Sequence, residues 1–366
     1  MKRIKKQFLA ILLMASTFLS FTSDKPAYLL YDQEGKKAKY EKMLKALEEA
    51  DIIFFGELHT DPIAHWLQIE ITKALYEQKQ DALMLGAEMF ESDGQLIMDE
   101  YLSGMYEAKK FEAEMRLWGN YQTDYKPLVE FAKENNIPFI ATNIPRRYAS
   151  MVNYKGLEGL DSLSAEAKRY IAPLPINYDP EVKCYKEMLD MDLGMPKKEM
   201  GMPKTDTAMV KEGMEMPHSD STTVKGAMGM PGAEAGMPQS DTTMAGEGMP
   251  GGETAMPGKG GPMHGMSKKM PPMENLPKAQ AAKDATMAHF IMENWTKGKT
   301  MFHFNGSYHS NNFEGIVWHL KQQNPELKIM TINLVQQEEI DEVSEENLNS
   351  ANYIICVPES MTRTKR

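Results

Sequence analysis

Short apolar runs that alternate with amphipathic segments constrain the fold of this chain more than any other feature of its sequence. Seven such runs, rich in aliphatic, β-branched and aromatic residues, occupy positions 28–31, 51–55, 82–87, 137–141, 300–305, 328–335 and 353–357. Runs of this length predict buried strands, and the segments with helical spacing between them predict crossover helices. The alternation therefore predicts an α/β domain with a largely parallel sheet flanked by helices.

A long segment rich in Met, Pro and Gly interrupts this alternation. Residues 194–275 repeat Met-Pro dipeptides, have no apolar periodicity and contain no Phe, Tyr, Trp or Ile and only two valines. Such a composition cannot bury a core. We therefore predict a disordered insertion here, with the α/β domain built from residues 24–193 and 276–366. Because the entropy of loop closure grows slowly with length, the fold tolerates the insertion.

Deleting the insertion is expected to leave the domain folded. Replacing residues 195–273 with a short Gly/Ser linker should leave the thermal midpoint nearly unchanged, because the removed segment has no residues that form a core. The measurement is thermal unfolding of both chains by circular dichroism. Insoluble protein, or a midpoint lowered by more than a few degrees, would show that the segment packs against the domain.

The first residues have the pattern of a secretory signal. Basic residues 2–6 precede an apolar stretch, residues 8–21, that is too short for a comfortable membrane span. We predict that residues 1–23 are a signal peptide and that the mature protein is periplasmic or at the cell surface. The formal net charge of -11 argues against nucleic acid as the main partner, because phosphate binding requires clustered Lys and Arg.

Local signals predict where several helices begin. Asp61 followed by Pro62 has the pattern of an N-cap and a first helical residue, and Pro145 opens another helix. Asn311 and Glu314 are predicted to cap the helix that runs to about residue 323. A polar residue just after a strand can therefore simply cap the following helix. A functional role for such a residue needs further support.

Two Gly-x-x-His motifs follow predicted strands. Residues 56–59 come after the second apolar run, and residues 306–309 come after the fifth. The carboxyl ends of parallel strands share one edge of a sheet, where open α/β sheets bind their ligands. The two histidines, His59 and His309, are therefore expected to meet in one site.

Other ionisable residues are predicted at the same edge. The five candidates for a catalytic site are Glu57, His59, Glu88, Arg146 and His309. Glu and His side chains hold divalent cations and help to activate water, so the predicted metal ligands are His59, Glu88 and His309. Three further histidines are interpreted as structural: His65 and His319 within helices, and His303 within a strand.

The residues around these motifs resemble a known family. The blocks at residues 54–65, 88–90, 118–128, 141–146, 280–288 and 305–309 are similar to successive blocks of the ChaN-like haem-binding proteins. These proteins belong to a superfamily with the Tiki proteases, the TraB-like proteins and the erythromycin esterases. The resemblance covers the chain outside the predicted signal and insertion.

The resemblance implies a function as well as an α/β fold with a helical lid. It implies an exported protein of iron acquisition that binds haem as a homodimer through tyrosine and works with outer-membrane haem uptake machinery. The tyrosines in or near the lid are Tyr148, Tyr154, Tyr170 and Tyr178, of which Tyr148 and Tyr178 are the candidate haem-binding residues. Tiki-like members use the Gly-x-x-His and Glu positions for metal-dependent peptide hydrolysis, so the alternative is a metal-dependent peptidase or esterase.

The Met-rich segment carries a third hypothesis. Thioether and imidazole groups suit Cu(I), and the densest cluster is at residues 263–266, where His264 lies among methionines. Buffering of copper or another soft metal would follow. The plainer interpretation is a degenerate repeat that expanded by drift, because no Met spacing here requires a metal.

Overall fold

The computed structural model describes residues 25–192 and 271–365 of the chain. The predicted signal peptide and nearly all of the predicted insertion, including the segment of the copper hypothesis, lie outside the described residues. Both described ranges contribute strands to one sheet. Within these ranges, no helix has the length and apolar character required to cross a membrane.

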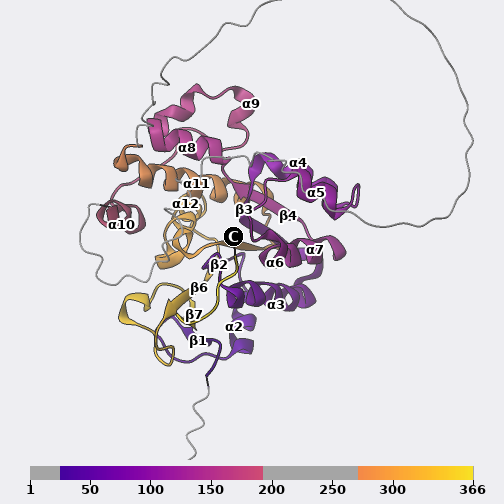
Figure 1. The fold of residues 1–366 in the computed structure, drawn as a ribbon, viewed down its shortest axis with the longest axis vertical. Coiled ribbons are helices and arrows are strands. Elements are labelled where there is room, and N and C mark those ends of the chain that lie inside the picture. Colours follow the sequence, from indigo (N-terminus) through magenta and orange to yellow (C-terminus); the bar gives the residue numbers. More distant parts are fainter. Residues whose placement is uncertain (1–24, 193–270, 366) are drawn as a thin grey trace, which may run out of the picture. The chain divides into compact units, whose positions relative to one another are not determined.

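Seven strands form this sheet in the order β1-β7-β6-β2-β5-β3-β4 (Figure 1). Their bounds are β1 (Leu29–Asp32), β2 (Ile52–Glu57), β3 (Leu83–Glu91), β4 (Phe139–Asn143), β5 (Thr300–Gly306), β6 (Ile329–Gln337) and β7 (Tyr353–Pro358). All neighbouring strands are parallel except the edge strand β1, which is antiparallel to β7. The predicted α/β fold with a largely parallel sheet is confirmed. Strand β5 lies between β2 and β3, so the segments on either side of the insertion interleave.

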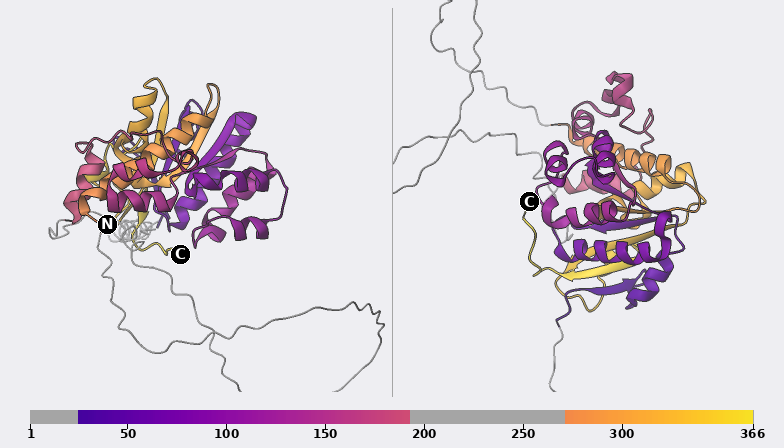
Figure 2. Two further views of the ribbon diagram at one scale, coloured as in Figure 1. Left: turned by 90° about the horizontal axis from the view of Figure 1, so that it is seen from above. Right: turned by 90° about the vertical axis from the view of Figure 1, so that its right-hand side faces the viewer.

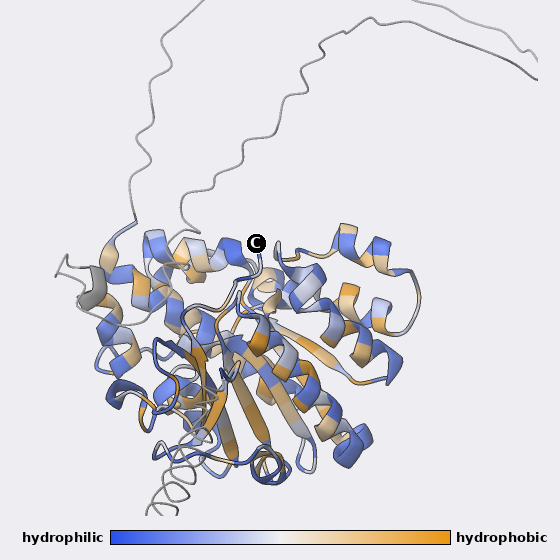
Figure 3. Ribbon diagram, turned by 60° about the horizontal axis from the view of Figure 1, so that its bottom comes forward, coloured by the Kyte–Doolittle hydropathy of each residue, from blue (hydrophilic) through white to orange (hydrophobic). Residues whose placement is uncertain are grey.

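Helices flank the sheet on both faces (Figures 1 and 2). The described α-helices are α2 (Tyr40–Leu47), α3 (Pro62–Lys79), α4 (Gln95–Leu102), α5 (Ala108–Glu114), α6 (Tyr121–Asp124), α7 (Lys126–Glu134), α8 (Arg146–Lys155), α9 (Ala165–Lys168), α10 (Lys183–Asp192), α11 (Leu276–Asn294) and α12 (Ile316–Gln323). Strand β2 shows how the sheet separates two cores. Ile53 and Phe55 pack with residues of α2, α3 and α7, whereas Ile52 and Phe54 pack with residues of α11 and α12. This alternation follows from the two-residue period of a strand, and the strands are mainly apolar (Figure 3).

The predicted beginning of α3 is confirmed, and that of α12 is wrong. Asp61 caps α3 by accepting hydrogen bonds from the backbone N–H groups of residues 63 and 64, at 2.9 and 3.1 Å. Helix α12 instead begins after Gly315, whose φ of 57° favours glycine, and no side chain caps it. Asn311 lies in a separate 3₁₀ turn, and the Glu314 carboxylate accepts a hydrogen bond from the backbone of Cys184 at 2.7 Å.

Helices α8 and α9 form a cap, which we define as residues 146–170. Apolar side chains of this cap pack against α11 in a small core that includes Val152, Leu160 and Ala282. A short turn just before α11 also touches the cap, because the Asn275 amide donates to the Asn153 carbonyl at 3.3 Å. The cap occupies the part of the chain where a helical lid was predicted.

Candidate functional site

Three adjacent strands bring polar residues together at the carboxyl edge of the sheet. Glu57 ends β2, Glu88 lies near the end of β3, and Gly306 ends β5, which lies between them. His59 follows β2 by two residues, and His309 lies in the 3₁₀ turn that follows β5. Glu57, Glu88 and His309 are buried, and the side chain of His59 is only 10% exposed. The structure thus brings together four of the five predicted catalytic residues.

The first half of the cluster lies on the face of the sheet covered by α3. Glu57 accepts a hydrogen bond from the Tyr125 hydroxyl at 2.6 Å, another from the Gln68 amide, and lies 2.9 Å from Nδ1 of His59. Nδ1 of His65 is 3.8 Å from the same carboxylate. Burial alone would raise the pKa of Glu57, but His65, His59 and Tyr125 outweigh burial and lower it. Glu57 is therefore a carboxylate that orients His59.

The second half lies on the face covered by α11. Nε2 of His309 is 3.1 Å from Glu88, and Nδ1 is 2.5 Å from Asp284 on α11. Burial would lower the pKa of His309, but the two carboxylates raise it to about 10. Burial would raise the pKa of Glu88, yet His309 holds it well below its usual value. At neutral pH, His309 is an imidazolium between two carboxylates.

Gly306 is where the two halves meet. Its backbone N–H donates to Glu88 at 2.8 Å. A Cβ atom at this position would lie 2.8 Å from Nε2 of His59 and 3.5 Å from Oε2 of Glu88. His59 therefore reaches across the end of β5 toward Glu88, and the absence of a side chain at Gly306 is what permits this approach.

Tyr185 continues the hydrogen-bond network of His309 and Asp284 toward helix α10. The Tyr185 hydroxyl donates to Asp284 at 2.9 Å and lies 3.2 Å from Nε2 of His319. Burial is the largest cause that lowers the pKa of His319. Helix α10, which carries Tyr185, is thus tied to His309 through Asp284.

The C-terminal residues lie against the loop of the first motif. The backbone N–H of Thr364 donates to the Thr60 carbonyl at 2.9 Å, and its hydroxyl donates to Asp124 at 2.7 Å. The same carboxylate is 3.3 Å from Nε2 of His65. His65 therefore takes part in the network around Glu57, beyond the structural role that its helical position predicts.

His303 lies beneath the cluster, within the sheet. Its Nε2 is 2.8 Å from the Thr142 hydroxyl, and its Nδ1 is 3.1 Å from the side-chain amide oxygen of Asn305. Burial lowers the pKa of His303 to about 4, so this ring is neutral at physiological pH. The position agrees with the interpretation of His303 as a structural histidine of a strand.

The arrangement does not fit the divalent cation that the sequence led us to expect at His59, Glu88 and His309. A metal-ligating histidine must be neutral and present a free lone pair. His309 instead has a carboxylate at each ring nitrogen and a raised pKa. Among residues 25–192 and 271–365, no group of three or more His, Cys, Asp or Glu side chains is arranged to hold a metal ion.

Arg146 is separate from this cluster. It is exposed at the first position of α8, and no hydrogen bond or ion pair joins it to the described residues. Its neighbour Arg147 forms an ion pair with Asp93 at 2.6 Å and donates to the Tyr148 hydroxyl at 3.2 Å. Arg146 therefore belongs to the surface of the cap, and its predicted catalytic role has no contact to support it.

The two predicted haem-binding tyrosines are poorly presented to a ligand. Tyr148 is buried and lies under the Arg147 guanidinium, 4.4 Å from its ring centre. Tyr178 is half-buried and packs against Tyr185, with 5.7 Å between ring centres. Tyr154, on the last turn of α8, is 49% exposed. Among the four tyrosines considered, Tyr154 has the most accessible phenol.

The partners of the two motif histidines were not predicted. Asp284 is one helical turn from Gln280, whose amide nitrogen is 3.0 Å from Nδ1 of His309. Both residues are buried on a helix of mainly small and apolar side chains. Similarly, Gln68 is buried on α3 within one turn of His65. Polar residues spaced three or four apart on an otherwise apolar helix face were the signal that could have identified these partners.

Comparison with known proteins identifies the family through one family model and supports the fold through one solved structure. Residues 43–320 match the family model described as "Haem-binding uptake, Tiki superfamily, ChaN". A solved structure titled "Cofacial heme binding to ChaN of Campylobacter jejuni" is similar over 90% of this chain and 96% of that chain, with 17% identity and a TM-score of 0.54. The type III effector HopBA1 covers 87% of this chain at 10% identity and a TM-score of 0.39, with 92% of that chain covered.

A plant protein is similar over a shorter segment. The protein RETICULATA-RELATED 5, chloroplastic, from Arabidopsis thaliana is 26% identical over 146 residues, which are 38% of this chain. The match spans only 19% of the length of that relative.

Proposed function

The chain belongs to the ChaN family of haem-binding uptake proteins in the Tiki superfamily, and from this membership we propose that it binds haem itself. The observation that carries the proposal on this chain is the exposed phenol of Tyr154 on the cap. Phenolate oxygen is a known axial ligand of haem iron. Export to the periplasm or cell surface and a role in iron acquisition belong to the same proposal and are supported by the signal-like pattern of residues 1–23.

A hollow beside the turn that contacts α8, the helix that carries Tyr154, offers apolar surface to a ligand. Met273, in the turn beside the end of α8, is 41% exposed, and Leu189 lines a hollow together with Met273. Exposed apolar side chains of this kind offer contact area to a porphyrin face. The cluster at the carboxyl edge is less suitable for haem. Glu57, Glu88 and His309 are buried, and each already forms hydrogen bonds or ion pairs within the protein.

The charge of the cap complements the haem propionates. The cap has five basic and three acidic residues within a chain of net charge -11. Arg146 and Lys155 are exposed and form no ion pair with the described residues, so both are available to carboxylates. Lys155 directly follows Tyr154. A guanidinium or ammonium near the iron ligand would fix the orientation of the haem.

Homodimerisation is part of the same proposal. A tyrosine on a surface helix would supply one oxygen ligand to haem iron, and a second copy of the chain could then shield the rest of the haem from water. The solved Campylobacter relative is described as binding heme cofacially. We extend this arrangement to the present chain, in which a homodimer would hold haem between its two copies. Exchange of haem with outer-membrane uptake machinery belongs to the same proposal.

A haemin titration tests the proposal. Haemin should give a saturable Soret shift, and Tyr154→Phe should weaken binding at least about tenfold, which corresponds to about 1.4 kcal/mol. Tyr170→Phe is the matched control, because this phenol also lies on the cap but is engaged by Glu166 at 3.1 Å. His59→Ala should leave the shift intact.

Two outcomes would contradict this assignment. The absence of a saturable shift at micromolar haemin would remove haem binding as the function. Acid–base chemistry at the carboxyl-edge cluster would then be the leading candidate, since Glu57 holds Nδ1 of His59 and directs Nε2 toward Glu88. A shift that survives Tyr154→Phe and disappears in His59→Ala would place haem at the sheet edge.

A further inference from the structure

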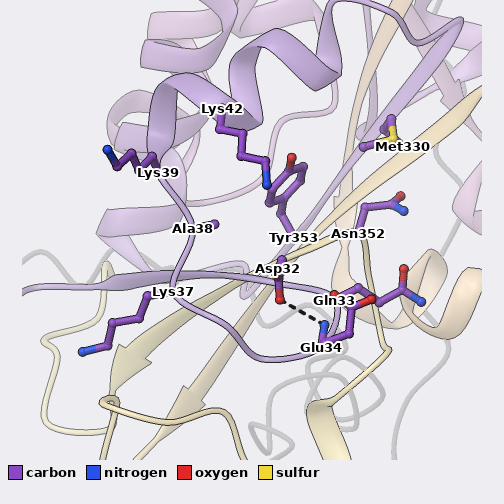
Figure 4. A pocket seen from close by; sticks show the side chains of 10 residues that line it. All are labelled: Asp32, Gln33, Glu34, Lys37, Ala38, Lys39, Lys42, Met330, Asn352 and Tyr353. Carbon is purple, nitrogen blue, oxygen red and sulfur yellow. Dashed lines mark hydrogen bonds between the residues drawn. The ribbon is translucent and has the colours of Figure 1, made fainter.

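The chain crosses the carboxyl edge of the sheet after β7. Residues 359–365, which we call the strap, leave the end of β7 and run to the loop that follows β2 (Figure 1). The root of the strap is fixed, because the backbone N–H of Glu359 donates to the Gln337 carbonyl at 3.1 Å. The beginning of β7 lies at the opposite edge, beside a hollow of about 460 Å³ lined by Asp32 and Tyr353 (Figure 4). The strap therefore links the outer part of the sheet to the loop of the first Gly-x-x-His motif.

Thr364 fastens the far end of the strap to that loop. Its backbone N–H donates to the Thr60 carbonyl at 2.9 Å, and its hydroxyl donates to Asp124 at 2.7 Å. The carbonyls of the two preceding residues, Leu58 and His59, accept hydrogen bonds from groups outside the strap. The strap thus holds the last of three successive carbonyls in this loop.

The contact of the strap with the domain is small. Within the strap, Met361 and Thr364 are half-buried and the other described residues are exposed. Arg363 adds a hydrogen bond from its guanidinium to the Gln336 side chain. A segment held by a few partly exposed hydrogen bonds and little apolar area opens at low cost while the domain stays folded.

The Asp61 carboxylate opposes closure of this loop. Asp61 is fully buried, and its Oδ2 has no hydrogen-bond partner among the residues that the structure describes. Burial raises the pKa of Asp61, although the hydrogen bonds that cap α3 and the charge of Arg363 act in the other direction. An unpaired buried oxygen costs free energy, which a hydrogen bond from water would recover if the loop opened. The closed strap is therefore favoured by Thr364 and opposed by Asp61.

The loop that the strap holds also orients His59. Nδ1 of His59 lies 2.9 Å from Glu57, and Nε2 lies against Gly306. The His59 side chain is only 10% exposed. Because Thr60 directly follows His59, release of the Thr60 carbonyl frees the backbone that positions the ring.

We propose that the strap is a gate for the carboxyl edge of the sheet. While Thr364 is bound to Thr60, the ring of His59 is held in place and shielded. When the strap is released, the ring becomes accessible to small molecules from solvent. The two states interconvert locally, without unfolding of the sheet. The gate is separate from the haem site proposed at Tyr154.

Two substitutions release the strap by different amounts. Thr364→Val removes the hydroxyl and keeps the backbone N–H, whereas Thr364→Pro removes both donors. The probe is diethyl pyrocarbonate, which acylates accessible neutral imidazoles, and mass spectrometry gives the rate at His59 relative to His289, whose side chain is 27% exposed. Thr364→Val should raise this rate about fivefold, as expected for the loss of one hydrogen bond, and Thr364→Pro at least about tenfold.

Thr362→Val and Thr362→Pro are the matched controls. Thr362 is an exposed threonine of the same strap and forms no hydrogen bond with the described residues, so both variants should react as the natural protein does. Hydrogen exchange shows whether the release is local. The backbone N–H of Asp61 should exchange faster in the Thr364 variants, while α2, beside the hollow of Figure 4, should exchange as in the natural protein.

Three results would overturn the gate. The first is an unchanged rate at His59 in both Thr364 variants. The second is an equal acceleration by the Thr362 variants. The third is faster exchange throughout α2 together with Asp61, which would mean a general loss of stability. Haemin binding should be the same in all four variants, so the gate and the haem proposal are tested by separate measurements.

Discussion

Replacing Asp284 by alanine is expected to lower the free energy of unfolding by about 3–5 kcal/mol. The Asp284 carboxylate is buried and contacts Nδ1 of His309 at 2.5 Å and the Tyr185 hydroxyl at 2.9 Å. Its removal leaves the His309 imidazolium with one carboxylate partner instead of two, and leaves a buried hydroxyl without its acceptor. Breaking a buried ion pair by deleting one partner has a cost in this range because the remaining charge cannot return to water.

Chemical denaturation at pH 6.5 measures this effect, because His309 is protonated there. Asp284→Asn should cost less than alanine, since the amide oxygen can still accept a hydrogen bond from Nδ1 or from Tyr185. Glu293→Ala is the control on the same helix: its side chain is 59% exposed, and its contact with His289 is 3.8 Å, so the change should stay within about 0.5 kcal/mol. Equal effects of Asp284→Ala and Glu293→Ala would show that the contacts of Asp284 with His309 and Tyr185 do not stabilise the fold.

The strands of the sheet were predictable because their sequences carry the signal locally. A run such as Ile52–Phe55 is apolar on both sides of the strand, as a parallel strand between two helical layers requires. The order of the strands was not predictable in this way. Strand β5 lies between β2 and β3 although most of the chain separates it from both, and only packing of the whole domain determines that placement.

The carboxyl edge was predictable for the same reason, and the partners of its residues were not. Glu57, Glu88 and both motif histidines lie at or just after the carboxyl ends of strands. Because parallel strands end at one edge of a sheet, the sequence already implied that these residues lie along the same edge. The two carboxylates have partners from different helices. Glu57 is held by Gln68 of α3 and by Tyr125, the residue between α6 and α7, whereas Glu88 meets α11 through His309 and Asp284. The sequence therefore suggested a metal site at His59, Glu88 and His309 that the structure does not support. It did not reveal that the Asp284 carboxylate would contact Nδ1 of His309.

The sequence also could not predict which tyrosines are exposed. Tyr148 and Tyr154 lie on the same helix, six residues apart, and differ only in which side of α8 meets the core below it. Val152 of α8 packs inward with Tyr148, so Tyr154 projects outward. The amphipathic period of a helix predicts such a contrast only when the direction of the core is known.

Stability of the protein is expected to fall as pH rises from about 6.5 toward 10, because His309 loses its proton in that interval. The folded-state pKa of His309 is raised from 6.5 to about 10 by Glu88 and Asp284. A raised pKa contributes stability that is fully present below the unfolded-state value and is lost as pH approaches the folded-state value. The slope from this one group is at most about 1.4 kcal/mol per pH unit.

His309→Gln distinguishes this group from the others that titrate in alkali. The variant should be less stable than the natural protein at pH 6.5, because it leaves Glu88 and Asp284 buried without a cation. It should also lack the alkaline decline, so the difference between the two proteins narrows between pH 6.5 and 10. At acid pH the direction reverses for Glu88, whose lowered pKa gives a contribution that is lost as pH falls through it. Unfolding midpoints at several pH values supply the comparison, and parallel curves for the two proteins above pH 6.5 would mean that His309 is already neutral in the folded state.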